Sequence, residues 1–135
     1  MNFDEYQLAA SGTFKEHIAL TPGKAELLDW SMGLAGETGE VCELVKHVVF
    51  HNEPADKMKL AKELGDVLWY VSAIAKSQDI ELSACAVLNI AKLAHRYENG
   101  YAHGASKERH DKETRFEDTS IYQGLKLIIE RGVNT

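Results

Sequence analysis

Only two prolines, Pro22 and Pro54, interrupt the helical pattern of this chain. Proline ends or kinks a helix because it lacks a backbone N–H and its ring clashes with the preceding turn. Both prolines stand where apolar side chains begin a new run at helical spacing. The sequence therefore predicts an all-α fold, a bundle of four main helices plus a short C-terminal helix. We expect the main helices at about residues 2–17, 24–50, 55–76 and 82–97, and the short one at 121–131.

Length and charge restrict the class of protein. A chain of 135 residues predicts a single domain, in which residues 1–101 form the helical core and residues 102–135 add a charged arm and the short helix. The net charge of −6, with both signs mixed, indicates no surface for nucleic-acid polymers and no polybasic patch for membranes. No apolar run approaches the ~20 residues that span a bilayer, and no signal peptide is recognisable. We expect a cytoplasmic protein, and we interpret Cys42 and Cys85 as buried thiols of a reducing compartment.

Two acidic pairs at i,i+3 spacing are the features most relevant to chemistry. Glu37 and Glu40 fall within the apolar stripe of the second predicted helix. Glu63 lies at the border of the apolar face of the third, and Asp66 lies further round that helix. Carboxylates on a core-facing side have to be paired, protonated or bound to a metal, because an isolated buried charge is costly. We interpret the two pairs together as a site for a hard divalent metal, most simply Mg²⁺ with a phosphate-bearing substrate.

The fourth predicted helix supplies the opposite charge. Asn89, Lys92 and Arg96 are spaced i, i+3, i+7 and therefore share one side of it. Cations there suit the phosphate oxygens that a metal also holds. In the alternative interpretation, Lys92 and Arg96 pair directly with the carboxylates of neighbouring helices. The chain is then a non-catalytic interaction or regulatory module with an internal salt-bridge network.

Three further features concern packing. Gly33, Gly36 and Gly39 are costly inside a helix and indicate close approach of another helix or of a ligand. Trp69 falls opposite the apolar face of its helix, so we expect it to be exposed and to favour a subunit interface. Residues 102–119 mix both charge signs with few large apolar side chains, which predicts a mobile loop or an arm that orders against a partner.

Three ordered motifs resemble those of the MazG-like nucleotide pyrophosphohydrolases, within the all-α nucleoside triphosphate pyrophosphatase group. They are Gly33-Leu-Ala-Gly-Glu37-Thr-Gly-Glu40-Val, Lys62-Glu63-Leu-Gly-Asp66-Val-Leu-Trp-Tyr70 and Asn89-Ile-Ala-Lys92-Leu-Ala-His-Arg96-Tyr97. The resemblance covers roughly residues 3 to 101. It departs from the family pattern where Glu98 and Tyr101 replace the usual proline and phenylalanine.

The resemblance implies an enzyme that hydrolyses a nucleoside triphosphate, commonly a deoxynucleotide, to the monophosphate and pyrophosphate. It implies Mg²⁺, sometimes Mn²⁺, and a core completed by dimerisation, as a homodimer or a dimer-of-dimers tetramer. The four acidic residues match the catalytic metal ligands, and the residues of the fourth helix match positions that approach the phosphates. The matching positions are Glu37, Glu40, Glu63 and Asp66 for the metal, and Asn89, Lys92 and Arg96 for the substrate. Among the acids we assign to Glu40 the orientation or deprotonation of the attacking water.

Overall fold

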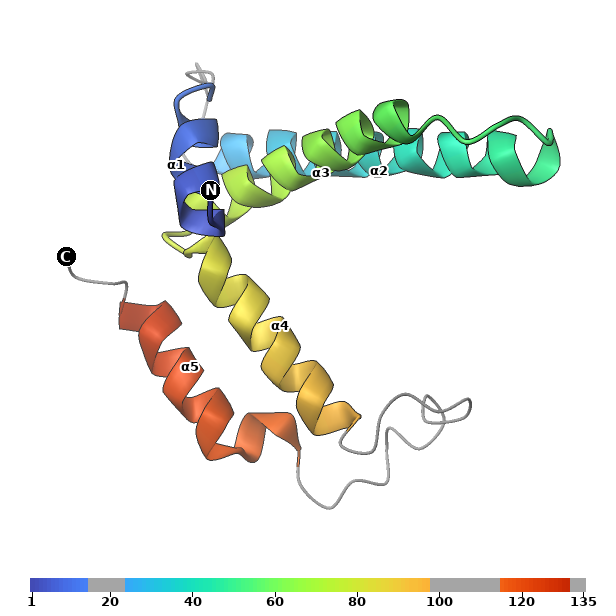
Figure 1. Cartoon of the computed structure of the whole chain (residues 1–135). Coiled ribbons are helices and arrows are strands. Elements are labelled where there is room, and N and C mark those ends of the chain that lie inside the picture. Colours follow the sequence, from blue (N-terminus) through green and yellow to red (C-terminus); the bar gives the residue numbers. More distant parts are fainter. Residues whose placement is uncertain (15–23, 98–114, 132–135) are drawn as a thin grey trace. The chain divides into compact units, whose positions relative to one another are not determined.

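The computed structural model describes residues 1–14, 24–97 and 115–131, and the regular structure within these ranges is all helical (Figure 1). This confirms that the fold is all-α, whereas the packing of the helices into one bundle completed by dimerisation stays a prediction. The chain divides into two compact units, Met1–Asp79 and Ile80–Thr135. The extent of the predicted single domain stays a prediction. The elements are α1 (Phe3–Ser11), α2 (Lys24–Phe50), α3 (Lys57–Ser77), α4 (Leu82–Arg96), the short 3₁₀ helix η2 (Phe116–Asp118) and α5 (Ser120–Arg131).

The first helix is shorter than predicted, because α1 ends at Ser11 and not near residue 17. The hydroxyls of Ser11 and Thr13 each donate to the backbone carbonyl three residues earlier, at 2.7 Å. Such side-chain bonds compete with continuation of the helix, and Gly12, which follows Ser11, is a poor helix former. The predicted residues from 15 onward lie outside the described ranges.

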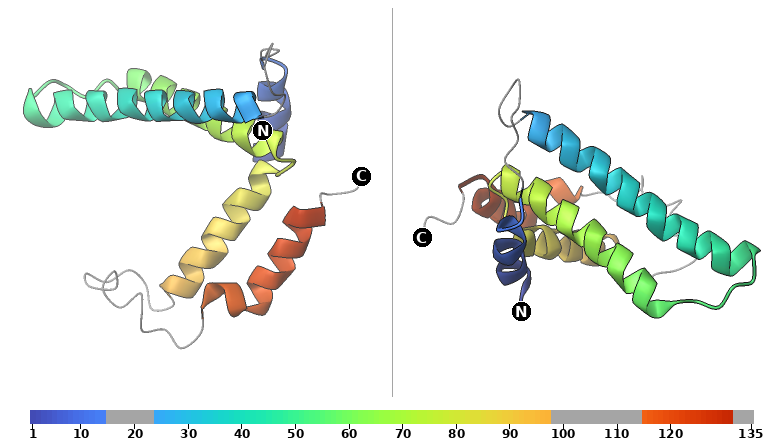
Figure 2. Two further views of the ribbon diagram at one scale, coloured as in Figure 1. Left: turned by 180° about the vertical axis from the view of Figure 1, so that it is seen from behind. Right: turned by 90° about the horizontal axis from the view of Figure 1, so that it is seen from above.

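In the first unit, α2 and α3 run side by side in opposite directions, and α1 lies across the end of α3 (Figures 1 and 2). The connection after α2 uses Asn52 at a positive φ of 54°, a conformation that asparagine tolerates well. Asp56 then caps α3 by accepting hydrogen bonds from two backbone N–H groups at 3.0 Å. The result is a long antiparallel helical hairpin formed by α2 and α3.

The crossing of α2 and α3 explains one of the three glycines. A Cβ added to Gly33 would overlap the ring of Tyr70 on α3, so only glycine allows this approach. Cβ atoms on Gly36 and Gly39 would meet nothing within 4 Å in the described structure. The prediction of close approach is therefore confirmed at Gly33 alone.

Trp69 is half-buried, so the predicted exposure of this side chain is wrong. Its indole N–H donates to the hydroxyl of Thr13 at 2.8 Å. Its ring packs edge-on against Phe14, with ring centroids 5.3 Å apart, and Phe14 in turn contacts the buried Trp30 at 5.2 Å. The segment that follows α1 covers a face of α3 that the helical pattern alone had left open.

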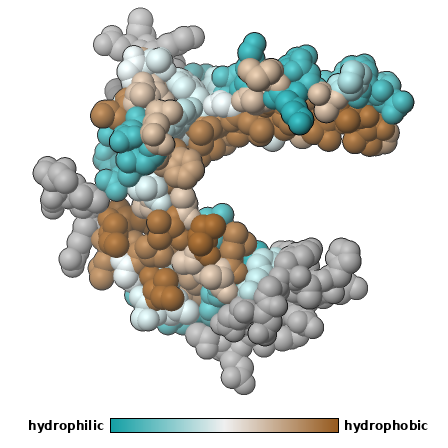
Figure 3. Space-filling view, in the orientation of Figure 1, coloured by the Kyte–Doolittle hydropathy of each residue, from teal (hydrophilic) through white to brown (hydrophobic). Residues whose placement is uncertain are grey.

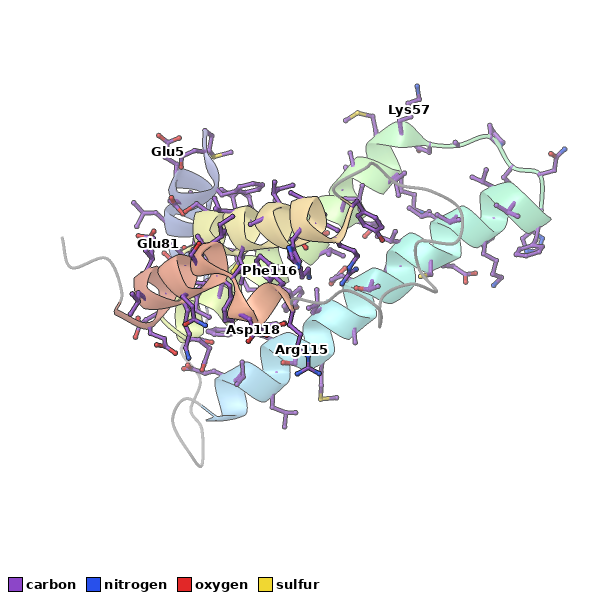
Figure 4. All side chains as sticks on the ribbon, turned by 90° about the horizontal axis from the view of Figure 1, so that it is seen from below. Glu5, Lys57, Glu81, Arg115, Phe116 and Asp118 are labelled. Atoms are coloured by element: carbon purple, nitrogen blue, oxygen red, sulfur yellow. The ribbon has the colours of Figure 1, made fainter. Side chains whose placement is uncertain are left out.

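The second unit contains α4, η2 and α5. Phe116 of η2 is buried and packs between His95 of α4 and Tyr122 of α5, with centroid distances of 5.8 and 5.4 Å (Figure 4). Residues 115–119 are therefore ordered against their own chain, which corrects the prediction of a mobile arm for this part of it. Residues 102–114 of that predicted arm lie outside the described ranges.

Several surface features complete the description. Cys42 is exposed and Cys85 is half-buried, so the expectation of two buried thiols is wrong for Cys42. Large apolar side chains are also exposed on both helices of the hairpin, and Figure 3 shows apolar residues gathered along one side of it. In the described part of the chain, no helix combines the length and the apolarity that a membrane span requires.

Candidate metal centre

Three carboxylates from two helices converge in the first unit. Glu37 of α2, and Glu63 and Asp66 of α3, each offer an oxygen atom, and these oxygens all lie within 4.8 Å of one another. Glu63 and Asp66 are one turn apart on α3, and the antiparallel pairing of the hairpin brings Glu37 opposite them. Glu37 and Glu63 are half-buried and Asp66 is exposed. We call these three residues the acidic cluster.

The acidic cluster carries uncompensated negative charge. Burial raises the pKa of Glu37, and the charges of Asp66, Glu63 and Glu40 raise it further. Among the described residues, no lysine, arginine or histidine lies within salt-bridge distance of the three carboxylates. A bound cation would remove this repulsion, because carboxylate oxygens are the ligands that hard divalent ions prefer. The donor set therefore fits Mg²⁺ or Mn²⁺.

Glu40 lies outside the acidic cluster. The sequence predicts it on the core-facing side of α2, but it is exposed. The reason is geometric: three residues correspond to a rotation of ~300°, so Glu40 stands ~60° round the helix from Glu37, beyond the edge of the α3 contact. Its charge nevertheless raises the pKa of Glu37, so it lies near the cluster. Its predicted roles as metal ligand and as the base that orients water stay predictions.

The predicted phosphate-binding residues belong to the second unit. Asn89 and Lys92 are exposed on α4, and Arg96 is half-buried in its last turn. The guanidinium of Arg96 lies over the ring of Tyr97, 5.9 Å from its centroid. The three residues share one side of the helix, as their spacing predicts. Their contact with phosphates stays a prediction.

A second group of charged residues surrounds His47 near the end of α2. One ring nitrogen of His47 lies 2.9 Å from Glu53 and the other lies 3.2 Å from Glu43, and Lys46 contacts Glu43 at 2.8 Å. Hydrogen bonds and charge raise the pKa of His47 and lower the pKa of both glutamates. We call Glu43, Lys46, His47 and Glu53 the tip cluster. Here each acid has a cationic partner, as in an ordinary structural ion pair.

Sequence reasoning missed Tyr6 as a neighbour of the acidic cluster. Its hydroxyl lies 3.5 Å from the carbonyl oxygen of Gly65, the residue that precedes Asp66. Burial raises the pKa of Tyr6, and the charge of Asp66 adds to this effect. No local pattern marks the residue, because α1 reaches α3 only through tertiary packing.

Comparison with known proteins gives these residues a context. Over residues 27–101, more than half of its length, the chain matches the MazG nucleotide pyrophosphohydrolase domain. The chain belongs to this family. The matched stretch, here called the MazG segment, contains the acidic cluster, Glu40 and the polar residues of α4, whereas Tyr6 lies outside it.

One relative of this MazG protein is a phage protein. The chain is 34% identical over 119 residues to the gene 37 protein of Mycobacterium phage L5, an alignment that covers 81% of this chain and 100% of the phage protein. No solved structure matches the chain. The family therefore supports a nucleotide pyrophosphohydrolase, as the motifs predict.

Proposed function

We propose that this protein hydrolyses nucleoside triphosphates, preferentially deoxynucleotides, between the α and β phosphates, and that the reaction depends on Mg²⁺ or Mn²⁺. The products are a nucleoside monophosphate and pyrophosphate. The observation that carries the proposal is the acidic cluster inside the MazG segment, where three carboxylates meet and no cation from the described residues pairs with them. The mutual repulsion of these acids costs stability, and a bound divalent cation would remove that cost.

The chain's own residues divide the work of this reaction. Glu37, Glu63 and Asp66 hold the divalent cation, and Glu40, exposed beside them, orients the attacking water and accepts its proton. When bound, the cation neutralises phosphate charge and makes the water easier to deprotonate. Asn89, Lys92 and Arg96 bind the β and γ phosphates and steady the pyrophosphate as it leaves.

We further propose that the working form is a homodimer or a dimer-of-dimers tetramer. The side of α2 turned away from Trp30 and Glu37 carries Leu28, Met32 and Phe50, all of them exposed. Exposed apolar side chains in this number are typical of subunit contacts. Light scattering after gel filtration is expected to give two or four times the 15.0 kDa mass of the chain. A monomer at micromolar concentration contradicts this part of the proposal.

An assay of pyrophosphate release tests the activity. A panel of ribo- and deoxynucleoside triphosphates is incubated with the protein in Mg²⁺, in Mn²⁺ and in EDTA, and the products are separated by chromatography. We expect monophosphate and pyrophosphate in equal amounts with either metal, and neither in EDTA. Release of orthophosphate in place of pyrophosphate contradicts the proposed position of cleavage.

Thermal unfolding separates the enzyme from the non-catalytic alternative. A metal at ten times its dissociation constant stabilises the folded state by about 1.4 kcal/mol, which raises Tm by several degrees. We expect this rise with Mg²⁺, and a larger one with Mg²⁺ and a non-hydrolysable triphosphate together. A folded protein whose Tm responds to neither, and which releases no pyrophosphate from any triphosphate, is the interaction or regulatory module.

A further inference from the structure

Between the described residues of α1 and α3, two side-chain-to-backbone contacts matter for the acidic cluster and its surroundings. The hydroxyl of Tyr6 lies 3.5 Å from the carbonyl oxygen of Gly65, and the side-chain amide of Gln7 donates to the carbonyl of Ser72 at 3.4 Å. Gln7 and Ser72 are both buried, and Tyr6 is half-buried. The two acceptors are seven residues apart on α3, so neighbouring residues of α1 reach turns of α3 about 10 Å apart. These contacts touch different parts of the same helix.

Only the Tyr6 contact touches the turn that carries the acidic cluster. Gly65 precedes Asp66 directly, and Glu63 lies two positions before Gly65. Ser72, the acceptor of Gln7, lies six residues after Asp66. Tyr6 therefore occupies a place from which it can fix the position of Asp66.

The chemistry of the side chain agrees with this placement. A phenol donates a hydrogen bond while its ring packs against apolar neighbours, so it can hold a helix carbonyl from a half-buried position. Gly65 leaves the surface of α3 bare, because a Cβ there would meet nothing within 4 Å in the described structure. With no side chain at residue 65, the Gly65 carbonyl on α3 stays open to a hydroxyl from α1.

We propose that Tyr6 is a positioning residue for the metal centre: its hydroxyl fixes the α3 turn at Gly65, and through this turn it holds Asp66 in the geometry that binds a divalent cation. The inference rests on the proposed function. It adds to that function a residue from outside residues 27–101, the stretch that matches the MazG domain. Partners that orient metal ligands affect metal affinity more than they affect the fold.

Binding of Mn²⁺ to Tyr6→Phe tests the proposal, with free Mn²⁺ measured from its electron paramagnetic resonance signal. This change removes one oxygen atom and keeps the ring, so circular dichroism is expected to show the same helix content. We expect the dissociation constant for Mn²⁺ to rise about 3- to 10-fold. In the pyrophosphate assay, the Mg²⁺ concentration for half-maximal rate should rise by the same factor, while the rate at saturating Mg²⁺ changes less than about 2-fold.

Gln7→Leu is the matched control, because Gln7 makes the other contact between α1 and α3. We expect it to lower Tm without changing Mn²⁺ affinity at temperatures where the protein is folded. Equal Mn²⁺ affinity in Tyr6→Phe and the unaltered protein overturns the inference, as does equal weakening by Tyr6→Phe and Gln7→Leu. If the unaltered protein binds no Mn²⁺, the proposed function itself fails and the inference falls with it. The three failures are thus distinguishable.

Discussion

Glu37 on α2 faces Glu63 and Asp66, whereas Glu43, less than two turns further along the same helix, faces Lys46 and His47. The pKa of Glu37 is raised and the pKa of Glu43 is lowered, although both are glutamates at the surface of one hairpin. The tip cluster is complete within the chain. In the acidic cluster, by contrast, no described side chain provides a cation that could balance the negative charge. The opposite pKa shifts of Glu37 and Glu43 follow from their surroundings, which are burial and neighbouring acids for Glu37 and a lysine and a histidine for Glu43.

Neutralising one acid in each cluster is the most direct test of the difference between the two clusters. We expect Glu63→Gln to reduce the rate of pyrophosphate release about 100-fold or more, because it removes a metal ligand. Glu53→Gln, at the tip cluster, is expected to change the rate less than about 2-fold. Both rates are measured at saturating Mg²⁺ on protein whose helix content is unchanged. Equal losses in the two variants contradict the assignment of separate roles.

Gly33 tests whether the spacing of the hairpin maintains the acidic cluster. Gly33→Ala places a methyl group against the ring of Tyr70, and overpacking of this kind costs about 1–3 kcal/mol of unfolding free energy. Gly36→Ala is the control, since its Cβ enters open space; it is expected to stabilise the helix by about 0.5–1 kcal/mol. Urea denaturation measures both changes. A stable Gly33→Ala variant contradicts the close crossing of α2 and α3.

Glu37→Gln sharpens the comparison through stability. The raised pKa of Glu37 means that the folded state disfavours the carboxylate, so stability falls as the pH rises above the ordinary value of 4.5. At pH 7 without metal, Glu37→Gln is therefore expected to raise Tm by about 1–3 °C, and it should reduce the further rise caused by Mg²⁺. Glu43→Gln should instead lower Tm, because Glu43 has a lowered pKa and a cationic partner. A lower Tm for both variants contradicts the predicted repulsion.

The tip cluster gives the smallest effect. The raised pKa of His47 means that its contribution to stability is complete below pH 6.5 and is lost as the pH rises through the higher value of the folded state. The pKa values of Glu43 and Glu53 are lowered, so the contributions of these two carboxylates to stability are lost only as the pH falls below 4.5. Because these groups are exposed, screening keeps the effect small. We expect the unaltered protein to have a higher Tm than His47→Asn at pH 6, and this difference in Tm to shrink by pH 9. His51 and Lys59, which also act on Glu53, are present in both proteins and do not contribute to the difference.

The helices of the hairpin could be predicted closely because their signals are local. The run of apolar residues predicts α2, and Pro54 predicts the start of α3 to within about two residues of Lys57, where the structure has it. The end of α1 was missed although its signals are local, since the run Ser11-Gly12-Thr13 combines a poor helix former with two hydroxyls that bond to carbonyls three residues earlier. The burial of Trp69 depends on Thr13, which is 56 residues away in the chain. Sequence periodicity along α3 cannot predict that a side chain is buried by a segment so distant in the chain.

The acidic cluster was predictable in part for the same reason. Its two α3 members share a turn, and a short connection brings α2 back beside them, so Glu37 could be placed opposite Glu63 and Asp66. Glu40 is exposed although the sequence predicts it on the core-facing side. The ~100° step between residues gives the direction of each side chain, but it does not give the width of the surface that α3 covers. Tyr6 was missed because its position depends on how α1 packs on α3.

The placement of α1 has a practical consequence for anyone who trims this protein. A fragment cut to residues 27–101, the stretch that the family defines, keeps the carboxylates but loses Thr13 and Phe14, which contact the indole of Trp69. Apolar atoms that are buried in the intact chain would be exposed to water, and proteins with such exposed apolar surface tend to aggregate. Inactivity of that fragment would therefore not count against the carboxylates as metal ligands, because the fragment also lacks Tyr6 and the packing around Trp69.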